Sequence, residues 1–211
     1  PGTKTPNPLT MQVCNPPDSV IIEGLEKIPE SLLKMFKRGT IRIKFKSGSG
    51  KIRFPGGGIM QLSNGKSAEE RSLENGESVI SMDLCLNYQH SPRVVLAADP
   101  NCPENVLNKA AGLFQSFGKQ VSLIKDIPGM VLTRMVAMLV NEASMLVEEE
   151  VADLEDINLA MKKGLNYPLG SLEWGELSGH KNVVEILENL FSEYGKRYRS
   201  SSWLEQKDRI R

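Results

Sequence analysis

The stretch KDIPGMVLTRMVAMLVNEA, residues 125–143, marks the point at which the pattern of the sequence changes. Before Asp126, short strand-like segments alternate with turns and helices. After Asp126, apolar residues recur with helical spacing and no strand pattern follows. We therefore predict an α/β part that ends near Asp126 and an all-helical part beyond it. The same stretch places Arg134, Asn141 and Glu142 inside its most apolar segment, where polar groups need partners.

One long helix is expected from Pro128 to about Glu150. Its broad apolar face contains Leu132, Met135, Val136, Leu139, Ala143, Leu146 and Val147. Arg134, Asn141 and Glu148 lie on the other side. Because the helix is apolar on most of its circumference, we expect other helices to surround it.

Further helices are predicted after this one. Asp153 caps a helix that ends at Gly164, followed by a loop over residues 165–175 with one helical turn. Residues 178–195 carry the next apolar stripe, and residues 200–211 form a short terminal helix.

The part before Asp126 begins with a proline-rich tail or linker, residues 1–18. Residues 29–39 have the proline-first, glycine-last pattern of a helix. Residues 40–46 alternate between apolar and basic side chains, as a strand does, and lysines along its outer face discourage pairing at a sheet edge. The three glycines at 56–58 predict a turn between two strands rather than a phosphate-binding loop, because no GxGxxG or GxxxxGK[ST] motif is present.

Residues 77–86 and 92–98 are strand-like, and residues 101–118 predict a helix that Asn101 or Cys102 caps and Gly118 ends. Residues 119–125 form the next strand. Strand, helix and strand over residues 93–125 make a βαβ unit, which predicts a parallel pair.

Composition excludes little about partners. The chain of 211 residues has 26 Lys plus Arg and 26 Asp plus Glu, so its net charge indicates neither a nucleic-acid nor a membrane partner. No apolar run reaches the ~18 residues that a membrane span needs. Eight basic residues without an acid lie between Lys34 and Arg53, which we interpret as a solvated face, with a phosphate-bearing ligand as the alternative.

The thiols and histidines have no catalytic or metal-binding spacing. Cys14, Cys85 and Cys102 are far apart, and no CxxC motif includes them. Reduced thiols in a cytoplasmic protein are the natural interpretation. His90 and His180 have no ligand pattern around them, so we expect His90 to be an ordinary loop residue and no metal site to form.

The junction and the helical part resemble the L-3-hydroxyacyl-CoA dehydrogenase family. That family has Lys-Asp-x-Pro-Gly-Phe, Asn-Arg and Asn-Glu-Ala steps, then Asp-Ile-Asp-x-Ala and a Gly-x-x-x-Pro-x-Gly-Pro loop. The residues that match are Lys125, Asp126, Pro128, Gly129, Arg134, Asn141, Glu142, Ala143, Asp156, Ile157, Ala160, Gly164, Pro168 and Gly170. The resemblance is strong over about 90–195, faint over 40–90 and absent at the start.

The resemblance is closest to the degenerate second copy in long forms of these enzymes, such as those of phenylacetate breakdown. It implies three parts. Residues 1–18 would be a linker, and residues 19–126 a vestigial Rossmann-like domain with a mostly parallel sheet. Residues 127–211 would be a helical domain like that of 6-phosphogluconate dehydrogenase. The first residue is Pro1 rather than Met, which suggests a fragment of a longer chain or a trimmed chain. The resemblance to the second copy implies a C-terminal portion of such an enzyme.

The chain departs from the family pattern at the catalytic and cofactor-binding positions. The family's catalytic histidine would fall at Asp83 or Leu84, and its orienting glutamate within residues 96–98, none of which is acidic. Thr133 stands where the family has the Asn before Arg134. The Gly-rich dinucleotide turn is missing. The resemblance therefore implies NAD for the parent enzyme but no cofactor in this chain.

We interpret Arg134, Asn141 and Glu142 as a structural network, with the acyl-CoA channel as the alternative role. Pro128, Gly129, Thr133, Pro168 and Gly170 are the other family-motif positions, structural or lining a substrate channel. Asp83 lies between Met82 and Leu84 in a strand and is expected to face away from them, toward solvent.

The leading hypothesis is a structural, dimerising C-terminal portion of an NAD-dependent 3-hydroxyacyl-CoA dehydrogenase, not catalytic alone. Its expected partners are a second copy through the helical domain and the N-terminal catalytic half. An alternative is a module that binds acyl-CoA or another phosphate ligand without chemistry. A third is an independent enzyme of another reductase branch, which the missing glycine turn disfavours.

Overall fold

The structure, a computed structural model, describes residues 9–209, and it divides into two compact units. The first, here the α/β unit, contains residues up to Ser63 and Ser67–Ile127. The second, the helical unit, contains Asn64–Lys66 and the chain from Pro128 onward. The division between Ile127 and Pro128 lies beside the change of pattern at Asp126.

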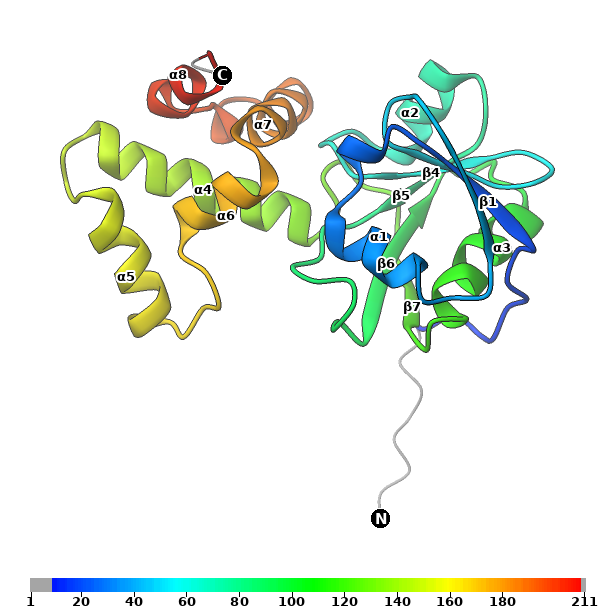
Figure 1. Cartoon of the computed structure of the whole chain (residues 1–211). Coiled ribbons are helices and arrows are strands. Elements are labelled where there is room, and N and C mark those ends of the chain that lie inside the picture. The colour runs from blue at the N-terminus through cyan, green and yellow to red at the C-terminus, as the bar shows by residue number, and fades with distance from the viewer. Residues whose placement is uncertain (1–8, 210–211) are drawn as a thin grey trace. The chain divides into compact units, whose positions relative to one another are not determined.

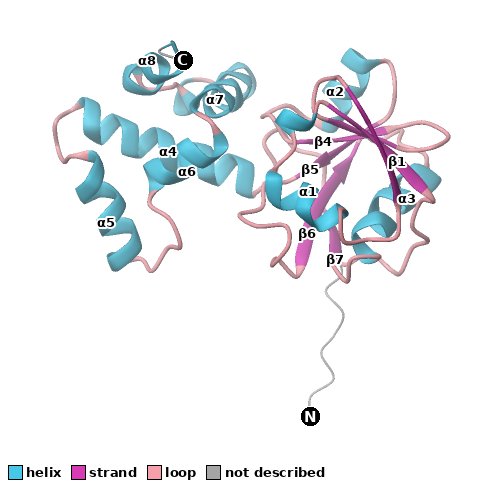
Figure 2. Cartoon of the chain, viewed as in Figure 1, coloured by secondary structure: helices cyan, strands magenta, loops and turns pink. Residues whose placement is uncertain are grey.

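A single sheet of seven strands forms the centre of the α/β unit (Figures 1 and 2). Its strand order is β2-β1-β3-β4-β5-β6-β7. The strands are β1 (Ser19–Glu23), β2 (Arg42–Lys46), β3 (Lys51–Arg53), β4 (Ile59–Leu62), β5 (Val79–Met82), β6 (Arg93–Ala98) and β7 (Gln120–Leu123). Between them lie η1 (Leu25–Lys27), α1 (Glu30–Phe36), α2 (Ala68–Asn75) and α3 (Glu104–Gln115).

The connections explain which strands are parallel. Pairs β1–β2, β4–β5 and β6–β7 are parallel, and each has a helix between its two strands. Pairs β1–β3, β3–β4 and β5–β6 are antiparallel. The predicted α/β fold class and the parallel β6–α3–β7 unit are confirmed. The sheet is mixed because no helix separates β3 from β4 or β5 from β6.

The main core lies on the face of the sheet that α1 and α3 cover. Alternate residues of the strands, such as Ile22 and Leu96, pack there against both helices and are fully buried. The rings of Phe36 and Phe114 join α1 to α3, with centroids 6.3 Å apart. Apolar alternation on this face therefore produces the buried side that the strand pattern predicts.

Helix α2 packs on the opposite face and is an element that the sequence analysis did not predict. Ser67 caps it, its hydroxyl accepting from the N–H of Glu70 at 3.1 Å. Gly76 ends it in the left-handed region, with φ of 67°. This is a capping sequence followed by a glycine stop, and the low apolar content of the segment concealed it.

Two further expectations about termini need correction. Residues 1–8 of the expected linker lie outside the described part, but residues 9–11 pair with β7, so this segment is not a free tail. Helix α3 starts at Glu104 with Pro103 as its N-cap and no side-chain cap, so neither Asn101 nor Cys102 fills that role.

The helical unit consists of α4 (Leu132–Glu148), α5 (Leu154–Gly164), α6 (Ser171–Ser178), α7 (His180–Tyr194), η2 (Lys196–Tyr198) and α8 (Ser202–Arg209). Helix α4 starts at Leu132 rather than at Pro128, because Gly129 and Met130 have positive φ angles of 76° and 49°. Asp153 caps α5, which ends at Gly164, as expected.

A second cap on α2 comes from the end of the α/β unit and yields a prediction. The carboxylate oxygens of Asp126 accept from the N–H groups of Ala68 at 2.8 Å and Glu69 at 2.9 Å. Asp126→Ala should lower the free energy of unfolding by about 1–2 kcal/mol, since both N–H groups lose their acceptor. Urea denaturation measures this. Lys125→Ala, the exposed neighbouring control, should change stability by less than about 0.5 kcal/mol. Equal effects of the two substitutions would contradict the capping role.

Candidate functional site

The polar residues of α4 form a stripe along one side of the helix. Arg134, Asn141 and Glu148 are each seven residues apart, which is two helical turns. All three contact the segment from Tyr194 to Trp203, which joins the end of α7 to the start of α8. These three residues, here the α4 stripe, therefore hold this segment against α4.

Asn141 is the central and most buried residue of the stripe, with 2% of its surface exposed. Its Nδ2 donates to the carbonyl of Arg199 at 2.9 Å, and its Oδ1 accepts from the N–H of Ser201 at 2.9 Å. An amide is the side chain suited to this place because it can donate and accept at once. Asn141 thus satisfies two backbone groups just before α8.

Glu148 lies two turns further along and holds the first turn of α8. Its carboxylate accepts from the N–H of Trp203 at 3.3 Å. The hydroxyl of Ser202, followed by the N–H of Trp203, holds the pKa of the Glu148 carboxyl below its ordinary value. A negative charge at a helix N-terminus is also favourable for the helix dipole.

Arg134 ties the start of α4 to the end of α7. Its guanidinium donates to the carbonyl of Pro128 and lies over the rings of Tyr194 and Tyr198, at 4.7 Å and 5.8 Å from the centroids. A cation over two aromatic faces is attracted by their quadrupoles. Gly129 is needed beside it, because a Cβ there would lie 2.9 Å from Leu190 Cδ2.

Glu142 does not belong to this network. It is exposed, whereas Asn141 beside it is buried. The expectation that Arg134, Asn141 and Glu142 act together within the core is wrong for Glu142, which lies about a quarter-turn from Asn141 and points outward. The contacts of Arg134 and Asn141 are with backbone groups and aromatic rings, which is a structural arrangement. Thr133 is buried, with 2% exposed.

The loop before α6 contains the last two motif positions. Pro168 is exposed, and Gly170 is the N-cap of α6. A Cβ on Gly170 would lie 2.2 Å from Asn158 Oδ1. That oxygen accepts from the N–H of Leu172 at 3.0 Å, so Asn158, from α5, caps α6 across the loop. Asn158 was not predicted from the sequence. The available signal was the glycine at the N-cap, which has no side chain and leaves N–H groups that another side chain must satisfy.

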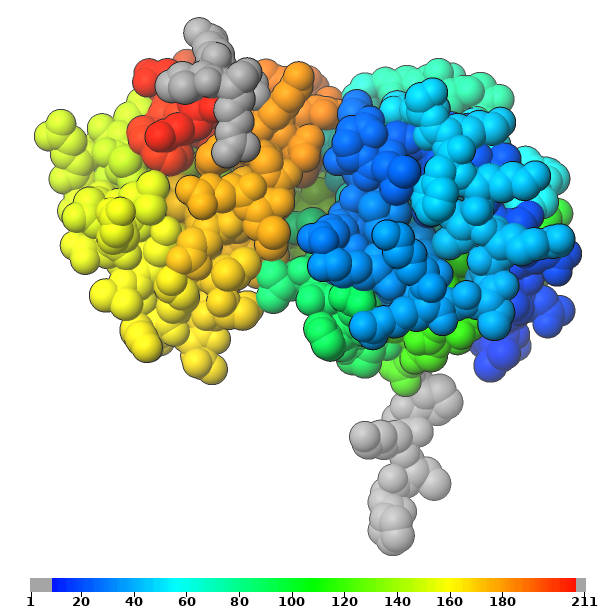
Figure 3. Space-filling model, viewed as in Figure 1, coloured from blue at the N-terminus to red at the C-terminus, as the bar shows by residue number. Residues whose placement is uncertain are grey.

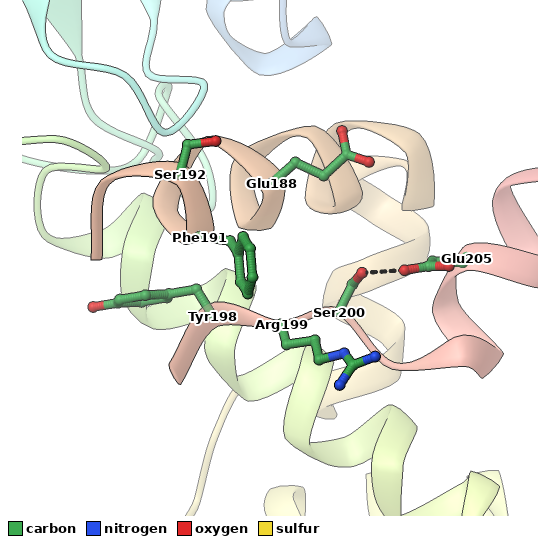
Figure 4. Close-up of a pocket in the computed structure, with 7 residues that line it drawn as sticks. All are labelled: Glu188, Phe191, Ser192, Tyr198, Arg199, Ser200 and Glu205. Carbon is green, nitrogen blue, oxygen red and sulfur yellow. Dashed lines mark hydrogen bonds between the residues drawn. The ribbon is translucent and has the colours of Figure 1, made fainter. Parts of the chain in front are cut away.

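A pocket of about 330 Å³ lies beside the docked segment, between α7 and α8 (Figure 4). It is lined by Glu188, Phe191, Ser192, Tyr198, Arg199, Ser200 and Glu205. Phe191 points from α7 toward the segment that carries Tyr198 and Ser200, and the Ser200 hydroxyl donates to the carboxylate of Glu205 (Figure 4). No histidine or cysteine lines this pocket.

The positions expected for catalysis in the α/β unit have other roles. Asp83 is buried, with 2% exposed, so the expectation that it faces solvent is wrong. One of its carboxylate oxygens accepts from the N–H of Leu84 at 2.9 Å. Its backbone carbonyl accepts from the hydroxyl of Tyr88, whose pKa burial raises well above its ordinary value. Ala97, where an orienting acid would stand, is fully buried, and His90 is in an exposed turn.

The three cysteines are free thiols, and burial makes two of them, Cys14 and Cys102, less reactive. Burial, and then the Asp99 carboxylate, raises the pKa of the Cys102 thiol to about 11. Burial also raises the pKa of Cys14. Since the thiolate is the reactive form, neither is an activated nucleophile. Among residues 9–209, no group of three or more His, Cys, Asp or Glu side chains is placed to hold a metal ion.

The turn after β1 is filled by the chain itself. Gly24 has φ of 72°, and a Cβ there would lie 2.3 Å from the carbonyl oxygen of Gly48. The loop between β2 and β3 also reaches Gly24 through Gly50, whose N would be 2.7 Å from that Cβ. The following helix is the three-residue η1, with no side-chain cap.

Some residues of the basic stretch form ion pairs, and others lie on an exposed strand. Lys34 lies 2.8 Å from Glu30, and Arg53 contacts the carboxylates of Glu23 and Glu77. The three basic side chains of β2 (Arg42–Lys46) are exposed on a strand at the sheet edge. Charged side chains on an edge strand oppose pairing with other chains, which favours the interpretation as a solvated face.

An α/β unit that ends in a parallel βαβ element, followed directly by a helical unit, is the architecture of a dehydrogenase with a Rossmann-type and a helical C-terminal domain. Two family models match in that order: the 3-hydroxybutyryl-CoA dehydrogenase reduced Rossmann-fold domain over residues 60–128, and the 3-hydroxyacyl-CoA dehydrogenase C-terminal domain over residues 129–210. The chain belongs to the 3-hydroxyacyl-CoA dehydrogenase family.

Similar proteins carry related names. The 3-hydroxyadipyl-CoA dehydrogenase of Escherichia coli K12 is 43% identical over 115 residues, which are 54% of this chain and 24% of that protein. A 3-hydroxybutyryl-CoA dehydrogenase of Clostridioides difficile is 36% identical over 83 residues, covering 39% and 30% of the two chains. A crystal structure of 3-hydroxybutyryl-CoA dehydrogenase from E. coli K12 aligns with a TM-score of 0.76 at 27% identity, over 99% of this chain and 39% of that one.

This chain thus spans a quarter to two fifths of the length of these relatives. No helix within residues 9–209 is long and apolar enough to span a bilayer.

The Asn141–Glu142 pair provides a matched test of the α4 stripe. Asn141→Ala should lower the free energy of unfolding by about 1–3 kcal/mol, because it leaves the Ser201 N–H and the Arg199 carbonyl without partners. Glu142→Ala should change it by less than about 0.5 kcal/mol. Urea denaturation followed by circular dichroism measures both. If both variants unfold like the wild type, Asn141 does not hold the segment before α8.

Thiol reactivity tests the environment of Cys102. With its pKa at about 11, roughly 1 in 10⁴ of its thiols is ionised at neutral pH, so alkylation should be far slower than for a free cysteine. The rate should rise about tenfold for each pH unit up to the pKa. Mass spectrometry after iodoacetamide pulses, with glutathione as reference, measures this. Alkylation of Cys102 as fast as glutathione would contradict the buried environment.

Proposed function

We propose that this chain is a structural, self-associating C-terminal portion of a 3-hydroxyacyl-CoA dehydrogenase and has no catalysis of its own. The parent reaction is the NAD-dependent oxidation of an L-3-hydroxyacyl-CoA to a 3-oxoacyl-CoA. The observation that carries the proposal is the filled turn after β1, where Gly48 and Gly50 occupy the space beside Gly24.

Dinucleotides in this class of fold bind at a glycine-rich turn that lets backbone and helix N-terminus approach the pyrophosphate. Here the loop between β2 and β3 closes against the turn that follows the first strand, β1, and η1 is too short to offer a helix N-terminus. The residues present do not fit NAD, so we propose that this chain holds no cofactor.

The surroundings of the positions expected for catalysis support the same proposal. General-base catalysis needs a group that ionises near neutral pH within reach of the substrate. Asp83 is buried, His90 lies in an exposed turn, and Leu96 and Ala97 are fully buried apolar residues. Thr133 provides a hydroxyl in place of the amide that the family pattern has.

Self-association follows from the exposed apolar surface of the helical unit. Among described residues, ten of the sixteen exposed large apolar side chains belong to this unit. Residues of α5 and the loop after it lie on its outer surface (Figure 3), and Leu159 and Leu165 there are 50% and 59% exposed. Met135, at the start of α4, is 52% exposed. Surface of this kind favours an isologous contact with a second copy.

Within the parent enzyme, the other proposed partner is the N-terminal catalytic half. The compartment that we propose is the cytoplasm, where the three free thiols would stay reduced.

Activity and cofactor binding test the proposal directly. The purified chain with NAD and 3-hydroxybutyryl-CoA should form no NADH above a boiled control, and calorimetry with millimolar NAD should show no binding. Turnover that is lost on His90→Ala would overturn the proposal, because it would identify a complete enzyme with a different site.

Self-association has its own test. The chain should be a dimer at tens of micromolar in sedimentation experiments, and Met135→Glu should shift it to monomer because it places a charge in the apolar contact. Leu73→Glu, on the α/β unit and 81% exposed, is the matched control and should leave the dimer intact. A monomeric wild-type chain would contradict the dimer.

A further inference from the structure

The segment Leu9–Pro17, here the strap, lies against the free edge of β7. The N–H of Met11 donates to the carbonyl of Val121 at 2.8 Å, and the N–H of Leu123 donates to the carbonyl of Leu9 at 2.9 Å. Thr10 and Ser122 form an antiparallel bridge between these bonds. The strap therefore pairs with the edge of the sheet through one antiparallel bridge, in the manner of peptides that bind by β-augmentation.

Side chains of α3 receive the strap after it leaves β7. Gln115 contacts it twice: Oε1 accepts from the N–H of Cys14 at 2.7 Å, and Nε2 donates to the carbonyl of Gln12 at 2.8 Å. Both bonds are to backbone groups. They therefore depend on an extended backbone and not on the identity of the side chains. In Figure 1 this part of the chain runs past α3 before it enters β1.

Gly112 allows the strap to lie close against helix α3. A Cβ at this position would lie 2.4 Å from the carbonyl oxygen of Asn15 and 2.8 Å from the nitrogen of Pro16. A glycine within a helix is unfavourable relative to alanine, because it loses more backbone freedom on folding. The close approach of the strap explains why glycine stands here.

The groove also selects side chains. Met11 and Cys14 pack against the core, whereas Val13 points out and is 94% exposed. At the other end, Arg93 donates to the hydroxyl of Thr10 at 3.0 Å. The contacts thus combine backbone pairing with two inward side chains, which is how a groove gains both affinity and specificity for an extended peptide.

We propose that the edge of β7, together with Arg93, Gly112 and Gln115, is a peptide-docking groove. Its ligand is an extended segment with a small or apolar side chain at the positions of Met11 and Cys14. In this chain the strap fills the groove in cis, and the same sequence offered by a separate peptide fills it when the strap is released.

Amide exchange in the full chain tests occupation in cis. Gly112→Val should raise the exchange rates of the Met11 and Leu123 amides at least about tenfold. The amide of Ile124, bonded to the carbonyl of Leu96, should stay protected. Gly164→Val, at a glycine with open space around it, is the matched control and should leave the strap amides protected. Unchanged exchange rates of the Met11 and Leu123 amides in Gly112→Val would overturn the proposal.

Binding in trans is tested with the full chain that carries Met11→Pro, which cannot donate to Val121. A labelled peptide with the sequence of residues 9–17, kept reduced, should bind this variant at least about tenfold more tightly than the same peptide with Met11→Pro. Protection of Ile124 shows that the variant is folded. Equal binding of the two peptides would overturn the proposal. Loss of Met11 protection on dilution of the wild-type chain would also overturn it, because the strap of a second copy would then fill the groove.

Discussion

The need to satisfy the first N–H groups of each helix is the constraint on which this structure depends. Four N–H groups at every helix start have no partner within the helix. In this chain, several of these starts are capped from a distance: Asp126 caps α2, Asn158 caps α6, and Glu148 caps α8, with Asn141 bonded just before it. Each capping side chain lies outside the helix that it caps, so the caps position the helices as well as stabilise them.

The α4 helix is the part of the helical unit in which this constraint is most visible. Its apolar residues pack against other helices, and its polar stripe holds the segment that leads to α8. Polar groups inside an apolar helix are costly unless they are paired. Here Asn141 bonds to backbone groups, and the guanidinium of Arg134 lies over aromatic rings. The architecture thus accounts for Arg134 and Asn141, whereas Glu142 lies outside this network.

The α/β unit has a family fold in which one turn and both sheet edges are closed by the chain's own residues. The β2–β3 loop closes on Gly24, and apolar residues fill the end of β6. Both edges of the sheet are protected, β2 by exposed basic side chains and β7 by the strap. Protected edges of this kind oppose pairing of the sheet with the strands of other chains.

The sequence by itself determined the change from α/β to helical structure near Asp126, the parallel pair β6–β7, and the bounds of α5, because periodicity and capping are local properties. It indicated the family, but it did not indicate α2, whose apolar content is low. Whether Glu142 is buried beside Asn141, whether Asp83 faces solvent, and which residue caps α6 were decided only by tertiary structure. The physical reason is that hydrogen bonds such as that from the Leu172 N–H to Asn158, or from the Ser201 N–H to Asn141, join residues distant in the chain, and burial depends on what packs from outside the element.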